Sequence, residues 1–449
     1  MKWEKSFFRT VCAIAVPVAL QSMLQSSFSV VDQVMIGQLG SASVSAIGLA
    51  GKFTSIFSVM VSAIATVAGI MMAQYLGQNN PGETRRSFRV NLTLASGLGG
   101  IFTLLCLVCP GSIMGLYTRD PETRQLGAAY LFLMAGTFFP VAGSTMLATV
   151  FRCTDRASLP LYASLAAAGL NTGLNYVLIF GKLGVSPMGV RGAAIATLIS
   201  QGANLAVSLG LYFRTGGRRQ RVPAAGAFRW GQFAAMLLPV LVCELLWSLG
   251  ENAYAVIYGH LGTQSSAAMT LINPVQSLMI GALCGLSQAA GILVGKILGG
   301  RDFEGAYGAS RRLMWYGLWG SAALSLLLLV CKPAYLSIYR VEPEVKRLTG
   351  QILTAYALIA PFKVQNMILG GGILRSGGRT RAVMWIDLIG TWVFGVPLGL
   401  LAAFVWKLTV PYVYFLLSLE ECVRFAISLA VFRRRGWMRQ ISGGGETAG

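Results

Sequence analysis

The chain has 449 residues, of which 55% are hydrophobic and 12% are charged, and that charged share is half the ~25% of typical soluble domains. This composition excludes a soluble enzyme and a disordered chain. Lys and Arg number 36 against 16 Asp and Glu, a net charge of +20. The positive residues form short clusters between long uncharged segments, as in membrane-protein loops, so we expect no nucleic-acid partner.

The apolar segments between these clusters predict membrane-spanning helices, each of which needs ~20 mostly apolar residues. Twelve segments qualify, in chain order at residues 11–36, 53–76, 90–117, 126–151, 157–180, 192–213, 230–257, 263–295, 313–331, 348–373, 382–405 and 408–432. They are too long for barrel strands and lack their alternation of apolar and polar residues. We therefore predict an all-α polytopic membrane protein that contacts the lipid bilayer.

The first half of the chain repeats in the second at an offset of 222 residues, and each half contains six predicted spans. The clearest matches are Pro17 with Pro239, Gly77 with Gly299, Tyr117 with Tyr339, and the turn Gly37-Gln38-Leu39-Gly40 with Gly259-His260-Leu261-Gly262. An even number of spans gives both copies the same orientation. Two six-helix bundles related by a pseudo-twofold axis along the membrane normal are therefore expected.

This repeat predicts the domain organisation. We expect an N-terminal six-helix lobe at 1–213, a cytoplasmic linker at 214–229, a C-terminal lobe at 230–435 and a cytoplasmic tail at 436–449. The loops on the side of the N-terminus carry most of the Lys and Arg, so both termini are predicted in the cytoplasm. A cavity between two such bundles, opened alternately by rocking, is the expected transport site.

Three stretches of the sequence carry a family resemblance. They are QSSFSVVDQVMIGQLG at 25–40, LPVLVCELLWSLG at 238–250, and the segment 361–378 with its glycine runs. These stretches resemble the first, seventh and tenth helices of the multidrug and toxic compound extrusion (MATE) family, and the resemblance covers the whole chain. Arg379 departs from the family pattern, which commonly has an acid there, so we expect an altered contact in a cytoplasmic loop.

The resemblance implies a secondary antiporter in the inner (cytoplasmic) membrane of a bacterium. Such a protein exports amphipathic organic cations, including drugs, dyes and toxic metabolites, in exchange for H+ or Na+ by alternating access. The resemblance implies no cofactor and no metal apart from the coupling ion. We expect a monomer.

Asp32 is the strongest candidate for ion coupling. A charge at the centre of a spanning helix costs at least ~2.5–3.5 kcal/mol, so an isolated intramembrane acid is functional by default; the alternative is an Asp that caps a nearby helix. By resemblance, Asp32 forms a cation site with Asn171, Asn175 and Thr197. Asn171 and Asn175 stand four residues apart on one helix face. With the carboxylate and the hydroxyl they form an all-oxygen set for Na+, whereas Asp32 alone could exchange a proton.

The seventh span carries candidate residues for substrate binding. Glu244 follows Pro239, which can free backbone groups for a cavity wall, and Trp247 and Glu251 lie near the same face. An acid beside an aromatic ring attracts an organic cation. The alternative for Glu244 is a buried ion pair with a lysine of the tenth span, and Glu251 is expected near the surface. Further cavity candidates are Gln33, Met35, Tyr254, Lys363, Asn366 and Met367.

The other intramembrane charges are interpreted as structural. Glu420 and Arg424 are four residues apart and predict an intrahelical ion pair. Asp387 lies near the cytoplasmic end of its span, where it is expected to pair with Arg379 or Arg381.

Two other functions compete with the antiporter. A lipid-linked precursor flippase of the same superfamily would need a strongly cationic cavity, whereas the predicted spans carry six acids against Lys363 and Arg424. A membrane-embedded enzyme would need a cluster of His or Asp residues, yet His260 is the only histidine. The antiporter is therefore the favoured interpretation.

Overall fold

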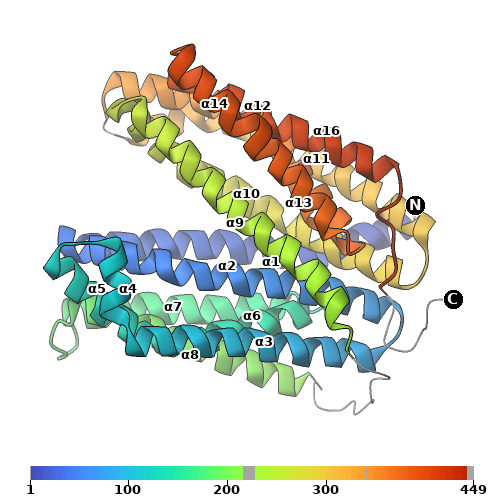
Figure 1. The fold of residues 1–449 in the computed structure, drawn as a ribbon, viewed down its shortest axis with the longest axis horizontal. Coiled ribbons are helices and arrows are strands. Elements are labelled where there is room, and N and C mark those ends of the chain that lie inside the picture. Colours follow the sequence, from blue (N-terminus) through green and yellow to red (C-terminus); the bar gives the residue numbers. More distant parts are fainter. Residues whose placement is uncertain (1, 216–227, 340, 442–449) are drawn as a thin grey trace. The chain divides into compact units, whose positions relative to one another are not determined.

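The computed structural model describes residues 2–215, 228–339 and 341–441, which form helices joined by short connections (Figure 1). In these described residues, eleven helical segments are long and apolar enough to cross a membrane. The predicted span 408–432 instead forms two shorter helices, α15 (Val410–Ser418) and α16 (Glu420–Arg433). The all-α polytopic fold expected from the sequence is confirmed.

The described residues of the first half, 2–215, form eight α-helices. In chain order they are α1 (Lys2–Gly37), α2 (Ser41–Gly77), α3 (Pro81–Val108), α4 (Pro110–Tyr117), α5 (Pro121–Met134), α6 (Phe138–Cys153), α7 (Ser158–Phe180) and α8 (Gly189–Arg214). A short 3-10 turn, Ala135–Thr137, joins α5 to α6, so these two helices together form one of the candidate spans.

The described part of the second half begins with α9 (Trp230–His260), α10 (Thr263–Gly299), α11 (Phe303–Ile338) and α12 (Pro343–Asn366). Then come α13 (Thr380–Leu388), α14 (Val396–Leu400), α15 and α16. Wider π-helical turns follow α12 at Met367–Leu374 and flank α14 at Ile389–Gly395 and Leu401–Val405. Such turns are uncommon and often occur at functional sites, because they change which side chains face a cavity.

Local sequence explains where several of these helices begin. The side chains of Asn80, Asp120 and Asp302 each accept a hydrogen bond from the backbone N–H three residues later, which satisfies a donor of the first turn. Pro81 occupies the first turn of α3, where its missing N–H costs no hydrogen bond. Hydrogen bonds from Thr123 lower the pKa of the Asp120 carboxyl below its ordinary value.

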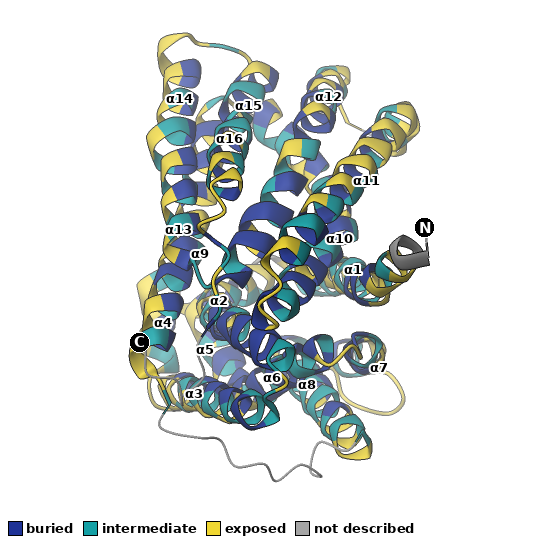
Figure 2. Ribbon diagram, turned by 90° about the vertical axis from the view of Figure 1, so that its right-hand side faces the viewer, coloured by how far each residue is buried: buried dark blue, intermediate teal, exposed yellow. Residues whose placement is uncertain are grey.

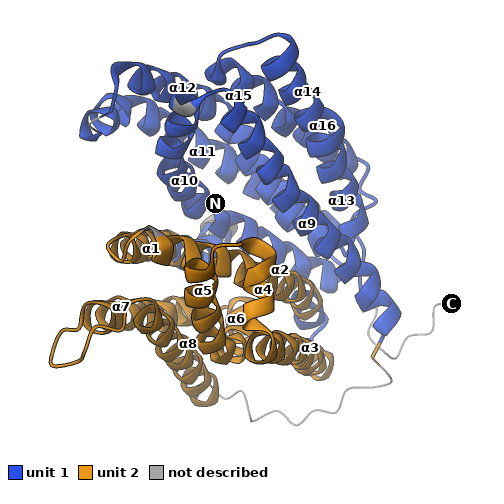
Figure 3. Ribbon diagram, turned by 60° about the vertical axis from the view of Figure 1, so that its left-hand side comes forward, with its two compact units in different colours: residues 1–19, 73–79, 229–449 blue, residues 20–72, 80–228 orange. Residues whose placement is uncertain are grey.

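By their internal contacts the helices divide into two compact units (Figure 3). The N-terminal unit comprises residues 20–72 and 80–228, and the C-terminal unit comprises residues 1–19, 73–79 and 229–449. The two units thus differ from the predicted lobes in the placement of 1–19 and 73–79. The four-part domain organisation stays a prediction, and most of its linker, residues 216–227, lies outside the described part of the chain.

The helix boundaries reproduce the sequence repeat. α2 and α10 each have 37 residues and begin 222 residues apart. Within the C-terminal unit their last turns approach closely: a Cβ on Gly77 would overlap the carbonyl of Lys296, and a Cβ on Gly299 would overlap the carbonyl of Gln74. Gln74 and Lys296 are also 222 residues apart, so the contact is reciprocal. Only glycine permits this approach of two backbones.

The helices bury one side and expose another, as the alternating colours along them show (Figure 2). In the C-terminal unit, the fully buried Ile272, Ile352 and Val413 join α10, α12 and α15 in one apolar cluster. Large apolar residues such as Trp319 and Val330 are about 70% exposed on α11 (69% and 70%). Exposed apolar faces of this kind are what a surrounding lipid phase requires.

The segment after α16 packs into the C-terminal unit. Trp437 is fully buried, and the backbone N–H of Ile441 donates to Gln74 Oε1 at 2.6 Å. This contact helps to explain why residues 73–79 belong to the C-terminal unit. The first part of the predicted tail 436–449 is therefore structured, and residues 442–449 lie outside the described part.

Candidate functional site

A cluster of polar side chains lies inside the N-terminal unit, on α1, α7 and α8. Asn175 Nδ2 donates to Asp32 Oδ1 at 2.7 Å and to Asn171 Oδ1 at 3.1 Å. Asn171 in turn lies 3.2 Å from Ser200 Oγ. Asn175 is only 2% exposed. The structure thus brings together three of the four residues predicted for ion coupling.

The Asn171 amide has two orientations with different chemistry. In one, its oxygen faces the Asp32 carboxylate, and two acceptors in contact require a proton or a cation between them. In the other, its nitrogen lies 3.1 Å from both carboxylate oxygens, and its oxygen accepts from Ser200 Oγ at 3.2 Å. The hydrogen bond from Asn175 to Asn171 exists only in the first orientation. Among the described residues no donor reaches the buried Oδ1 of Asn175, so this oxygen is available to a bound ion.

The fourth predicted residue, Thr197, lies one helical turn before Ser200. Its hydroxyl donates to the Ala193 carbonyl of its own helix at 2.9 Å, and its carbonyl accepts from Ser200 Oγ at 3.0 Å. Ser200 therefore supplies the hydroxyl beside Asn171. Sequence reasoning missed Ser200, although a spacing of three residues from Thr197 places both on one helix face.

A second polar site is a cavity of about 390 Å³ inside the C-terminal unit. Four residues predicted for the substrate site line it, namely Trp247, Glu251, Tyr254 and Lys363. Sequence reasoning missed most of the remaining polar wall, which includes Tyr258, Ser266, Thr270, Asn273, Gln276, Tyr356, Thr391, Tyr414, Ser418, Glu420, Glu421 and Arg424.

Acidic groups outnumber basic groups in this cavity. Glu251, Glu420 and Glu421 line it together with Lys363 and Arg424. The last four are partly or fully buried, whereas Glu251 is exposed, as its expected position near the surface requires. The rings of tyrosines and Trp247 supply aromatic faces. A concave site with these features favours a positively charged, partly apolar ligand.

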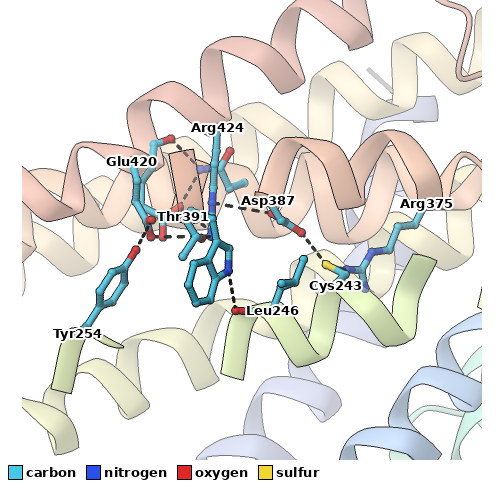
Figure 4. A network of polar contacts seen from close by, with 11 residues as sticks. Cys243, Leu246, Tyr254, Arg375, Asp387, Thr391, Glu420 and Arg424 are labelled. Carbon is cyan, nitrogen blue, oxygen red and sulfur yellow. Dashed lines mark hydrogen bonds and ion pairs between the residues drawn. The ribbon is translucent and has the colours of Figure 1, made fainter. Parts of the chain in front are cut away.

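Arg424 connects three acids at the cavity wall (Figure 4). Its guanidinium lies 3.8 Å from Glu420, 3.9 Å from Glu421 and 3.9 Å from Asp387. It also donates to Thr391 Oγ1, and the Tyr254 hydroxyl donates to Glu420. The predicted intrahelical pair of Glu420 with Arg424 is therefore one link of a larger buried network, which compensates for the burial of these charges.

The network continues along α9 (Figure 4). Cys243 Sγ donates to Asp387 Oδ2 at 2.7 Å, and Arg375 donates to Cys243 Sγ at 3.3 Å. Arg375 Nη1 lies 3.6 Å from Glu244 Oε1. The alternative prediction for Glu244, an ion pair with Lys363, is wrong. The reason is that Arg375 follows the π-helical turns and reaches α9, whereas Lys363 lines the cavity.

The predicted pairing of Asp387 with Arg379 or Arg381 is also wrong. Asp387 lies near the end of α13, about two turns after Arg379, and faces Arg424 instead. Arg381 is exposed. Arg379, which departs from the family pattern, lies beside Gly436 in the segment that follows α16.

The remaining predicted cavity residues lie outside the C-terminal cavity. Gln33 is exposed and Met35 is partly buried on α1 of the N-terminal unit. Asn366 lies behind the cavity wall, where its amide donates to the Glu421 carboxylate and carbonyl at 2.8 Å each. Met367 begins the π-helical turns, and its carbonyl accepts from Ser287 Oγ at 2.5 Å.

A duplicated set of membrane-spanning helices, with polar clusters buried inside its spans, is an architecture typical of membrane transporters. A family comparison agrees with this class. The chain belongs to the MatE family, whose model matches residues 17–177 and 239–401, one segment in each sequence repeat. It is thus a multi-pass MATE-family transporter and not an enzyme.

Relatives and solved structures agree with this assignment. The chain is 25% identical over 411 residues to a probable multidrug resistance protein NorM of Agrobacterium fabrum, covering 89% of this chain and 88% of that protein. It is 25% identical over 415 residues to human Multidrug and toxin extrusion protein 1, covering 88% of this chain and 69% of that protein. A mutant of the Vibrio cholerae MATE transporter VcmN has the same fold, with a TM-score of 0.86 at 15% identity over 98% of this chain and 100% of that one.

Proposed function

We propose that this protein is a secondary antiporter that exports amphipathic organic cations in exchange for H+ or Na+ by alternating access. The observation that carries the proposal is the C-terminal cavity, in which acids outnumber bases beside several aromatic rings. An organic cation gains from both features, through charge attraction and cation–π contact. The names of the relatives, multidrug resistance and toxin extrusion, support this substrate class.

Glu251 is the acid that we assign to first contact with the substrate. Glu420 and Glu421 lie within 4 Å of Arg424 (3.8 and 3.9 Å). Each also accepts a hydrogen bond, Glu420 from Tyr254 and Glu421 from Asn366, so both acids already have protein partners. Glu251 has no ion pair with any described residue and is exposed at the cavity wall. Its charge is therefore the one most available to an incoming cation.

Ion coupling is assigned to Asp32, Asn171 and Asn175, with Thr197 and Ser200 on the neighbouring helix. An ionised Asp32 favours the Asn171 orientation that donates to it. A proton on Asp32, or a Na+ beside it, favours the opposite orientation, with the amide oxygen toward the carboxyl group. Each change alters the contact with Ser200 on α8, which links ion occupancy to helix packing. Competition of ion and substrate for different conformations then couples their transport.

The bacterial relatives support a location in the cytoplasmic membrane. The excess of Lys and Arg in the loops on the N-terminal side supports a cytoplasmic position of both termini. We take the monomer as the working unit, because each chain contains both repeats and its own polar sites.

The test is efflux of an ethidium-like dye by inverted membrane vesicles under an imposed pH gradient or Na+ gradient. Wild-type protein is expected to move dye with one of the two gradients. Asp32→Asn cannot titrate and carries no charge, so gradient-driven efflux should stop, while Asp155→Asn, the same change at an exposed position, should leave it intact. Asn175→Ala should abolish Na+-driven efflux but only weaken H+-driven efflux.

Normal efflux by Asp32→Asn would refute the coupling assignment. A wild-type protein that moves none of a panel of varied cations, but moves a lipid-linked diphosphate, would favour the flippase instead.

A further inference from the structure

A groove of about 460 Å³ lies on the C-terminal unit, apart from the polar cavity. Residues of α11, α12 and α16 line it, and α12 packs against both other helices. Its walls are mainly aromatic and aliphatic, with Trp315, Leu318, Phe362, Phe425 and Leu429 among them. Trp315 is 54% exposed and Phe362 37%, so the groove is open along its length.

One end of the groove is cationic. Arg311 and Arg433 line that end, and the stacking of Tyr307 on Phe432, with ring centroids 4.8 Å apart, brings the first turns of α11 against the last turn of α16. Among the described residues no acid lines the groove, and neither arginine has an ion pair there. Two guanidinium groups at one end of a groove can together bind a phosphate group.

The groove changes from polar to apolar along the helix axes. Arg433 and Phe425 are eight residues apart on α16, which corresponds to about 12 Å. That distance is close to half the ~30 Å hydrocarbon thickness of a bilayer. Gln365 is 4% exposed and lies about one turn deeper than Arg311, since its amide donates to the Met314 carbonyl at 2.7 Å. Its Oε1 receives no hydrogen bond within the described part of the chain.

We propose that this groove binds an anionic phospholipid. The phosphate lies between Arg311 and Arg433, and one acyl chain lies against Phe362, Phe425 and Leu429. The lipid comes from the leaflet on the side where α11 begins and α16 ends. Basic pockets between membrane helices recognise anionic headgroups in this way. The phosphate supplies a partner for both arginines, and the acyl chain covers apolar wall that the described helices leave exposed.

The test measures lipid retention by the purified full-length protein with native mass spectrometry, after incubation with equal amounts of phosphatidylglycerol and phosphatidylcholine. Wild type should retain phosphatidylglycerol preferentially. Arg311→Gln with Arg433→Gln should weaken that binding roughly tenfold or more, given the attraction of each basic residue to an anionic lipid. Arg311→Lys with Arg433→Lys should retain part of it.

Two matched variants separate the proposal from simpler explanations. Arg89→Gln with Arg381→Gln removes the same charge from two exposed positions outside the groove, and it should bind as wild type does. An equal loss in this control would overturn the site, because net charge would then explain the binding. Leu429→Trp fills the apolar part and keeps both arginines, so it should also lose the lipid. Unchanged retention by this variant would overturn the acyl-chain site.

Discussion

The cavity and the groove of the C-terminal unit share two walls but differ in charge and polarity. α12 presents Lys363 to the cavity and Phe362 to the groove, and α16 presents Arg424 to the cavity and Phe425 to the groove. Successive residues of a helix point about 100° apart, so a step of one residue separates a polar wall from an apolar one. Most cavity charges interact with one another, whereas neither groove arginine forms an ion pair with a residue that the structure describes.

The largest expected effect on the free energy of unfolding comes from removing a buried charge that is paired with other charges of the protein. Arg424→Gln leaves Glu420, Glu421 and Asp387 without their shared cation, and breaking a buried ion network in this way costs about 3–5 kcal/mol. The free energy of unfolding in detergent measures it. Arg433→Gln in the groove removes the same charge from an exposed position, where a change within about 0.5 kcal/mol is expected. Equal losses in the two variants would contradict the difference between the two regions.

The shared wall should show an intermediate effect. Phe425→Ala removes a ring that packs edge-on against Phe362, with centroids 6.0 Å apart. Because Phe425 is only partly buried, we expect a loss of about 2 kcal/mol, below the ~3–5 kcal/mol of a fully buried Phe. Thermal unfolding of the detergent-solubilised protein is the measurement. Phe425→Leu, which keeps most of the apolar volume, should recover at least half of the loss.

Changes at the cavity charges that form no ion pair among the described residues, Glu251 and Lys363, should alter ligand binding more than stability. Glu251→Gln should weaken dye affinity about fivefold, since an exposed charge contributes roughly 1 kcal/mol at contact distance. Lys363→Met should act in the opposite direction, because it removes a positive charge from the same wall. Equilibrium dye binding, measured by fluorescence anisotropy, compares the dye affinities of the two variants. Weaker binding by both variants would show that the cavity does not select cations by charge.

The smallest effect is expected for the groove arginines in transport. Arg311→Gln with Arg433→Gln should change the initial rate of dye efflux less than twofold, because neither side chain lines the cavity. Efflux from inverted vesicles of unchanged lipid composition is the assay. A loss as large as that of Glu251→Gln would indicate that the two regions act on transport together, through the helices they share.

Sequence reasoning predicted the helical architecture well because it depends on properties of single segments. Eleven predicted spans correspond to long helices, since ~20 apolar residues must form a helix in a bilayer to satisfy their backbone. The span 408–432 divides at Leu419, and the last part of the predicted span 90–117 forms the separate short helix α4 after Cys109. Apolar composition could indicate neither break. The repeat also predicted corresponding helices. Its matched glycines Gly77 and Gly299 lie at a contact where any Cβ would collide, so both positions require glycine.

The candidate sites were predictable only where their residues share a helix face. Asn171 and Asn175 lie one turn apart on one helix face, whereas their meeting with Asp32 was implied by the family resemblance and not by spacing. The expected partners of Glu244 and Asp387 were wrong. Asp387 was paired with an arginine close to it in the sequence, and Glu244 with a lysine expected at a similar depth in the membrane. Their actual partners, Arg375 and Arg424, depend on how α9, α13 and α16 are rotated about their axes.

The sequence by itself determined that this protein is a duplicated, multi-pass helical transporter with acids inside its spans. The length of an apolar segment, the spacing of the repeat and the number of charges can all be read along the sequence. None of them depends on how the helices are rotated about their axes. The tertiary structure decided which charges compensate one another, which acid stays available, and that the segment ending at Ile441 docks against Gln74. It also decided that one side of α12 and α16 lines an acidic cavity, whereas the other lines an apolar groove with Arg311 and Arg433 at one end. Those outcomes depend on rotations of a few tens of degrees, which hydrophobic pattern alone does not specify.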